Sequence, residues 1–190
     1  ATNSVECGAS ASLPITVLAN PFAVIAPDNT LGCSPFLVNF ENNSISINGL
    51  PLSAFEFSFT DDSTSTVVFN TNAVAHTFNG IGTYYGQLVA IDAFGCKSSP
   101  AQVPITITQP NAFFAVDNVI CNQGNIIANN TSNGLNPISY EWLIYGDLFS
   151  TDIDLNTIFS EENIPENTSS ILHDLSLVAT DGNGCTDTMT

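Results

Sequence analysis

The chain has 190 residues, and 18 acidic side chains stand against a single basic one, Lys97, which gives a formal net charge of −17. Such a chain cannot neutralise phosphates, which excludes nucleic acid and anionic membrane surfaces as partners, and one Lys with two His leaves too little acid–base chemistry for an enzyme. No apolar run approaches the roughly 18 residues of a membrane-spanning helix, so we expect this segment not to insert into a membrane.

A short pattern that ends in Cys occurs three times, with its cysteines 89 residues apart. The copies are residues 1–7, 90–96 and 179–185. The segment that follows also recurs, because Leu13–Val17 matches Val103–Ile107 in its Pro and its alternating apolar residues. Self-similarity at a fixed period is the signature of tandem repeats.

The repeat divides the chain into three parts. We expect residues 1–18 to be the C-terminal strands of a preceding repeat, residues 19–108 a complete unit, and residues 109–190 a second unit that lacks its last strand. The chain is then a window on a longer tandem array.

Alternation of apolar and polar residues is the dominant local signal in both units, and it predicts half-buried strands. The segments that show it, in chain order, are residues 36–40, 55–59, 84–90, 103–107, 125–130 and 140–144. About seven short strands in roughly 90 residues, separated by turns, predict an all-β fold of tandem immunoglobulin-like β-sandwiches. Trp142 is expected in the core of its unit; an exposed Trp that stacks on carbohydrate is the alternative.

Five cysteines at regular positions predict disulfides, with one bond inside each unit. Each unit has one Cys near its first long strand and one near the end of its penultimate strand, which pairs Cys33 with Cys96 and Cys121 with Cys185. Cys7 is left for a cysteine of a preceding repeat. Metal ligation is the alternative, but there is no Cys-x-x-Cys pair and neither His lies near a Cys at ligand spacing. Disulfides imply an oxidising compartment, hence an exported, extracellular protein.

Several motifs resemble those of the PKD (polycystic kidney disease) family. Residues 76–84 resemble the segment that closes a PKD domain, and residues 55–62 and 140–147 resemble its aromatic–acidic strand and turn. The first unit lacks the Gly of that turn, and the second lacks the His-Thr-Phe segment. The Gly-Cys-x-Pro start at Gly32–Pro35 is similar to the Cys-bearing version found in tandem in giant surface adhesins of gliding Bacteroidota.

That resemblance implies the role of a spacer and adhesin in gliding motility, on an outer-membrane-attached protein exported by type IX secretion. The implied partners are neighbouring repeats of the same chain, other surface or motility proteins, and extracellular polysaccharide. It also implies O-glycosylation of a glycoprotein, because Ser63 and Thr188 stand in tripeptides that look like the signal used in that phylum.

Calcium is the one cofactor that the residues themselves suggest, because carboxylates in turns are its usual ligands. The candidates are expected at one loop end of their units: Asp61, Asp62, Asp147, Asp152 and Asp154. No EF-hand or nonapeptide repeat is present, so diffuse binding by the acidic chain is the alternative. No residue is predicted to be catalytic, and His76 and His173 are interpreted as structural.

Three functions follow from these observations. The first is a structural and adhesive stalk, a semi-rigid filament whose units unfold separately under force. The second is a set of glycan-binding accessory domains of a secreted polysaccharide-degrading enzyme, for which Tyr85, Tyr145 and Phe149 are the candidate exposed aromatics. The third, an enzyme that uses His76, has the least support.

Overall fold

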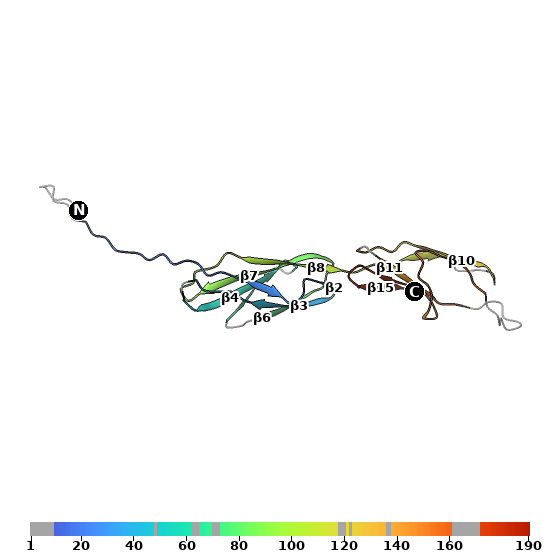
Figure 1. Ribbon diagram of the computed structural model, residues 1–190, viewed down its shortest axis with the longest axis horizontal. Coiled ribbons are helices and arrows are strands. Elements are labelled where there is room, and N and C mark those ends of the chain that lie inside the picture. Colours follow the sequence, from blue (N-terminus) through green and yellow to red (C-terminus); the bar gives the residue numbers. More distant parts are fainter. Residues whose placement is uncertain are drawn as a thin grey trace.

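The computed structural model of the chain is all-β and contains two sandwiches placed end to end (Figure 1). In the part of the chain that it describes there is no helix, and so none that could cross a membrane. The structure describes residues 10–47, 49–61, 65–69, 73–117, 121, 123–135, 138–160 and 172–190.

The first sandwich consists of two sheets, one of three strands and one of five. The smaller sheet has the order β1 (Ile25–Pro27), β3 (Phe36–Asn42), β6 (Ala73–Phe78). The larger sheet has the order β2 (Leu31–Cys33), β8 (Ala101–Thr108), β7 (Gly82–Asp92), β4 (Leu52–Phe59), β5 (Ser65–Val68). Neighbouring strands are antiparallel except β2 and β8, which run parallel.

The second sandwich repeats this arrangement. Its smaller sheet has the order β9 (Phe114–Val116), β10 (Asn125–Asn130), β13 (Leu155–Ile158). Its larger sheet has the order β12 (Asp147–Ser150), β11 (Ser139–Ile144), β14 (Leu175–Thr180), β15 (Thr186–Met189). Strand for strand these match β1, β3, β6 and β5, β4, β7, β8. The second larger sheet has no counterpart of β2 among the described residues, and β15 has four residues where β8 has eight.

Each sandwich has its own core, built from the strands in which apolar and polar residues alternate. In the first, Phe40, Phe57 and Phe78 are completely buried, and the rings of Phe40 and Phe59 lie 5.0 Å apart. In the second, Trp142 is completely buried, which confirms its prediction as a core residue. Its Nε1–H donates to the Asp152 carbonyl at 3.0 Å. The predicted immunoglobulin-like β-sandwich class is therefore confirmed.

The predicted pairing of Cys33 with Cys96 is wrong. Cys33 is bonded to Cys185, and Cys96 is a free thiol. Cys33 lies beside the end of β8, where β7 begins, whereas Cys96 follows the end of β7. An 11-residue strand spans about 35 Å, several times the Cα separation of about 4.4 to 6.8 Å that a disulfide permits.

The predicted pairing of Cys121 with Cys185 is wrong for the same reason. Cys121 precedes β10 near the end where Asn125 pairs with Ile158, and it is an exposed free thiol. Cys185 lies at the opposite end, where Asp187 Oδ2 accepts a hydrogen bond from the Ala112 N–H. The disulfide therefore joins the two sandwiches and does not lie within either of them.

Candidate functional site: the cross-linked junction

The first half of the junction is the point at which the chain leaves the first sandwich. The parallel pairing of β2 with β8 places Cys33 opposite Thr108, the last residue of β8. Gly32 stands next to it, where a Cβ would clash with the ring of Phe36. Cys33 is therefore held beside the last residue before the connection to the second sandwich.

The second half is a tight turn between β14 and β15. Asp181, which is only 4% exposed, accepts hydrogen bonds at Oδ1 from the backbone N–H groups of Asn183 (2.9 Å) and Cys185 (3.0 Å). Gly184 has a φ of 81°, in the left-handed region that favours glycine. A buried carboxylate thus folds the turn around itself and fixes the position of Cys185, which is 1% exposed.

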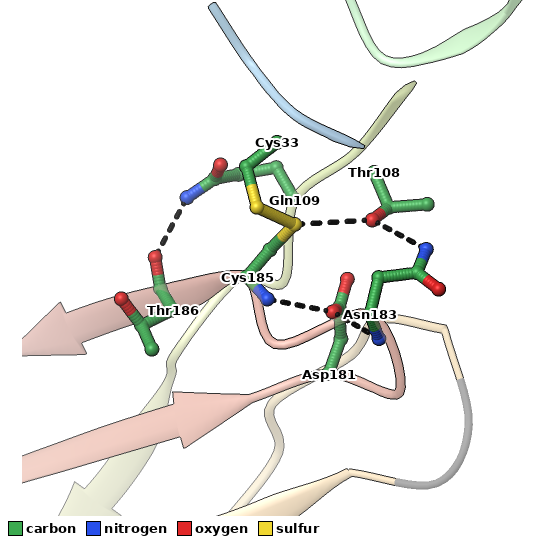
Figure 2. Close-up of a disulfide and its surroundings, with 7 residues drawn as sticks. All are labelled: Cys33, Thr108, Gln109, Asp181, Asn183, Cys185 and Thr186. Carbon is green, nitrogen blue, oxygen red and sulfur yellow. Dashed lines mark hydrogen bonds between the residues drawn. A yellow bond between two sulfur atoms is a disulfide. The ribbon is translucent and has the colours of Figure 1, made fainter. Parts of the chain in front are cut away.

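The disulfide closes the junction between these two halves, as Figure 2 shows. The Cα atoms of Cys33 and Cys185 are 5.4 Å apart, within the normal range for a disulfide. The Thr108 hydroxyl lies 3.3 Å from the sulfur of Cys185. The bond links residues separated by 152 positions in sequence, one in each of the two sandwiches.

Hydrogen bonds join the sandwiches around the disulfide (Figure 2). The Asn183 side-chain amide donates to the Thr108 hydroxyl at 3.0 Å, and the Gln109 amide donates to the Thr186 carbonyl at 2.8 Å. Thr108 ends β8 of the first sandwich and Gln109 follows it, whereas Asn183 lies in the β14–β15 turn of the second and Thr186 begins β15. The two sandwiches are therefore in direct polar contact.

The connection itself is short and well packed. Gln109 is followed by Pro110, which is less than 2% exposed. A Cβ on Gly134 would lie 3.0 Å from the Pro110 ring, so this part of the second sandwich approaches the connection closely. A Pro-containing connection and a disulfide at the same end give the sandwiches two covalent links, which restrict both bending and rotation.

The candidate calcium ligands that the structure describes do not form a cluster with one another. Asp61 accepts from His76 Nε2 at 2.9 Å, Asp152 from the Ser150 hydroxyl at 2.9 Å, and Asp154 from the Asn130 N–H at 2.9 Å. Asp147 pairs with Ile144 at the β11–β12 hairpin. Among the described residues no group of three His, Cys, Asp or Glu side chains could hold a metal ion; Asp62 lies outside those residues, and calcium stays a prediction.

The remaining candidates are distributed over both sandwiches. Thr188 is exposed on β15, where a glycan would find space, whereas Ser63 and Cys7 lie outside the described residues. Glycosylation, like the partner of Cys7, stays a prediction. Tyr145 and Phe149 are 56% and 41% exposed on the β11–β12 hairpin of the second sandwich.

Both histidines pack against aromatic rings. The His76 ring stacks on Phe59 with centroids 4.0 Å apart, while its Nε2 faces Asp61. The His173 ring lies 4.6 Å from Phe159 and 5.2 Å from Tyr145. These contacts give each ring a structural role in holding a loop against a strand.

The disulfide at the junction was not predicted from sequence, because the repeat spacing permits pairing between neighbouring units as readily as pairing within one unit. Cysteines that recur in every unit can pair within a unit or with the next unit. The discriminating signal was the position of Cys96, directly after Phe94-Gly95 in a turn and not on the inward face of a strand. A cysteine in a turn at the end of a sandwich can reach a neighbouring sandwich.

No protein-family model and no curated protein sequence matches the chain. Solved structures of β-sandwich modules resemble it. One, described as the structural basis for the promiscuous specificity of carbohydrate-binding modules from the β-sandwich superfamily, is 18% identical over 87% of this chain, with a TM-score of 0.47; this chain spans 56% of that one.

The other two are tandem modules. Fibronectin(III)-like modules of Clostridium thermocellum CbhA are 18% identical, with 87% of this chain and 91% of that chain covered and a TM-score of 0.36. The FN1–FN3 domains of chicken CNTN1 are 12% identical, with 89% and 65% covered and a TM-score of 0.34. The likeness is one of fold class, and no site residue is carried over from it.

Proposed function

We propose that the chain is a structural and adhesive repeat segment of a long extracellular surface protein, in which it acts as a semi-rigid stalk. The observation that carries this proposal is the Cys33–Cys185 bond between two sandwiches placed end to end. A stalk needs its modules to keep their relative orientation. Two covalent links at one junction, with hydrogen bonds around them, provide that property.

The location follows from the same bond. Disulfides persist in oxidising environments, so the proposed stalk lies outside the cell. The resemblance to Cys-bearing PKD-like repeats extends the proposal to an outer-membrane-attached adhesin of gliding Bacteroidota, exported by type IX secretion. Neighbouring repeats, surface or motility proteins and extracellular polysaccharide are then its partners.

The cross-link also changes how the segment bears load. A force applied at the two ends passes from the residues before Cys33 through the disulfide to the residues after Cys185. Residues 34–184, which hold most of both cores, lie outside the loaded path. The expectation from sequence that each unit unfolds separately under force is therefore replaced by the proposal that neither core unfolds while the disulfide is intact.

Single-molecule pulling from the two ends tests this role. With the disulfide intact we expect no event that releases residues 34–184. After reduction the same pull should unfold both sandwiches and release about 500 Å of additional chain, at about 3.5 Å per residue. Long unfolding events before any reduction would contradict the proposed stalk, because the junction would then not carry the load.

A second candidate function, glycan binding beside a secreted polysaccharide-degrading enzyme, is favoured by the exposed Tyr145 and Phe149. Exposed aromatic rings on one hairpin can stack on sugars. Calorimetric titration with polysaccharides would detect binding, and Tyr145→Ala should abolish it. Phe113→Ala is the control, since Phe113 is 52% exposed but lies beside β9. Binding lost only in the Tyr145 variant would favour this function over the stalk.

A further inference from the structure

The two free thiols of the described chain lie at the outer ends of the two-sandwich unit. Cys96 is half-buried in the β7–β8 turn of the first sandwich, at the end facing away from the second. Cys121 is exposed before β10, at the end of the second sandwich facing away from the first. Neither position can reach the other within one chain.

The turn that carries Cys96 has the same hydrogen bonds as the turn that carries the bonded Cys185. Asp92, 2% exposed, accepts at Oδ1 from the N–H groups of Phe94 and Cys96, both at 2.9 Å. The Gly95 N–H donates to the Asp92 carbonyl, as the Gly184 N–H does to Asp181. The φ angles of the two glycines are 84° and 81°. The first sandwich therefore presents Cys96 as the second presents Cys185.

Cys121 stands in the place of Cys33. Each precedes the first long strand of the smaller sheet, three residues before β3 for Cys33 and four before β10 for Cys121. Each unit thus has a Cys33-type cysteine before its first long strand and a Cys185-type cysteine in the turn of its larger sheet. One cysteine of each type is already bonded across the observed junction. The two that remain are one of each type, and each lies where a further junction of the same kind would form.

The surface beside Cys96 points to what would cover it. Leu13, Ile15 and Val17 are 84–86% exposed, although their counterparts in β8, Ile105 and Ile107, are buried. This segment has the sequence of a β8 strand but no sheet in the described chain. A shallow apolar hollow between it and the β7–β8 turn is lined by Thr16, Leu18, Leu50, Phe94 and Cys96.

The hollow corresponds to the observed junction. Leu18 and Phe94 occupy the places of Thr108 and Asn183, so two apolar side chains line the hollow where a hydrogen-bonded pair stands in the observed junction. The hollow is thus one side of a junction whose other side is the sheet that the Leu13–Leu18 segment would join. The partner that fits is another copy of the same repeat.

We propose that Cys96 and Cys121 each form a disulfide with a neighbouring repeat, Cys96 with the Cys33-type cysteine of the preceding unit and Cys121 with the Cys185-type cysteine of the following unit. This inference extends the proposed stalk and rests on its tandem arrangement. The bonds interlock, because each one spans the unit boundary and overlaps the next along the chain.

Interlocking bonds leave little chain to extend. In such an array the shortest covalent path along the filament would run from Cys96 through the connection to Cys121. From there it would cross the proposed Cys121 disulfide to the unit that follows the second sandwich. These 25 residues extend to about 90 Å at most, whereas two 11-residue β7-type strands end to end span about 75 Å. A filament built in this way stays close to its folded length even when its units unfold.

Each bond forms by thiol–disulfide exchange with a small disulfide as oxidant. One cysteine thiolate attacks a sulfur of oxidised glutathione and releases one glutathione thiolate; the second cysteine thiolate then attacks the mixed disulfide and releases the other. Two cysteines lose two protons and two electrons, and one oxidised glutathione becomes two reduced molecules.

The test is a longer chain, in which residues 1–190 are followed by residues 12–190 of a second copy so that the repeat spacing continues. Cys7 is replaced by Ser. In the test variant, C96S in the first copy and C121S in the second leave the first copy's Cys121 and the second copy's Cys96. In the control variant, C121S in the first copy and C96S in the second leave the two outer thiols. Both are oxidised with glutathione, denatured and alkylated.

We expect no alkylated cysteine in the test variant and two in the control, with Cys33–Cys185 present in both copies of each. Two alkylated cysteines in the test variant, with the Cys33–Cys185 bonds present, would overturn this inference and leave the stalk intact. Absence of the Cys33–Cys185 bonds themselves would instead overturn the stalk. Mass spectrometry of the non-reduced peptides distinguishes the two results.

Discussion

Removal of the cross-link by the double substitution C33S and C185S should destabilise the two-sandwich unit without altering either core. Cys33 lies beside Thr108, so when only the second sandwich unfolds, the disulfide closes a loop of about 77 residues between Thr108 and Cys185. When only the first unfolds, the closed loop from Cys33 to the connection has nearly the same length. Whichever sandwich unfolds first should therefore lose a similar amount of stability.

The magnitude follows from the entropy of loop closure. A loop of about 77 residues restricts the unfolded chain by about 15 cal/mol/K, or about 4.5 kcal/mol at 25 °C. For a domain of this size, 1 kcal/mol corresponds to about 4 to 8 °C in melting temperature. With both sandwiches unfolded the closed loop is 152 residues long, which adds less than about 1 kcal/mol, so we expect the transition of the sandwich that unfolds first to fall by about 20 to 35 °C and the other to change little.

Differential scanning calorimetry in oxidising buffer measures this change directly. C96S is the matched control, because it removes a free thiol in the equivalent turn and should shift the transitions by no more than a few degrees. If the double variant and C96S melted at the same temperature, the cross-link would contribute nothing and the argument from chain entropy would be refuted.

Three further predictions concern the core of the second sandwich, the turn that carries Cys185, and Asp28 after the first edge strand. Trp142→Ala removes a completely buried side chain and should cost the second sandwich about 3 to 5 kcal/mol, while the first transition in calorimetry stays in place; a shift of both would contradict separate cores. Asp181→Ala removes both hydrogen bonds to the Cys185 turn and should slow formation of the Cys33–Cys185 bond in thiol-trapping experiments, whereas Asp92→Ala should not; equal rates in both variants would count against a role of the turn in placing Cys185. The side-chain amide and then the backbone N–H of Asn39 hold the pKa of Asp28 below the ordinary 3.8, so the stability that this carboxylate contributes is complete above pH 3.8 and lost as the pH falls through the lowered pKa. Asn39→Ala should move its NMR titration midpoint up towards 3.8, and an unchanged midpoint would show that these bonds are not the cause.

The strands could be predicted from sequence because alternation reports directly on burial. Residues 36–40 and 84–90 alternate, and the structure places them in β3 and β7 with one face in the core. Trp142 was predicted correctly for the same reason, since a large aromatic on a central strand fills the space between two sheets. Local patterns determine which residues face inwards.

The cysteine pairing could not be predicted in this way, because it depends on which end of a sandwich each residue occupies. The two cysteines of a unit recur at nearly the same spacing, which suggests a pair. The length of β7, however, places Cys33 and Cys96 at opposite ends of the sandwich. The partner of Asp61 could not be predicted for a related reason. Asp61 follows β4 of the larger sheet and faces His76 on β6 of the smaller one, and a local sequence pattern does not report contacts between sheets.

The central claim, that the disulfide joins the two sandwiches, can be tested with trypsin. Lys97 is the only basic residue, and it divides the chain between Cys33 and Cys185. Monomeric protein is denatured, its free thiols are alkylated, and it is cleaved at Lys97. The account predicts that the two fragments stay linked on a non-reducing gel and separate on reduction. Separation without reductant would show that the bonds lie within the units and would contradict it.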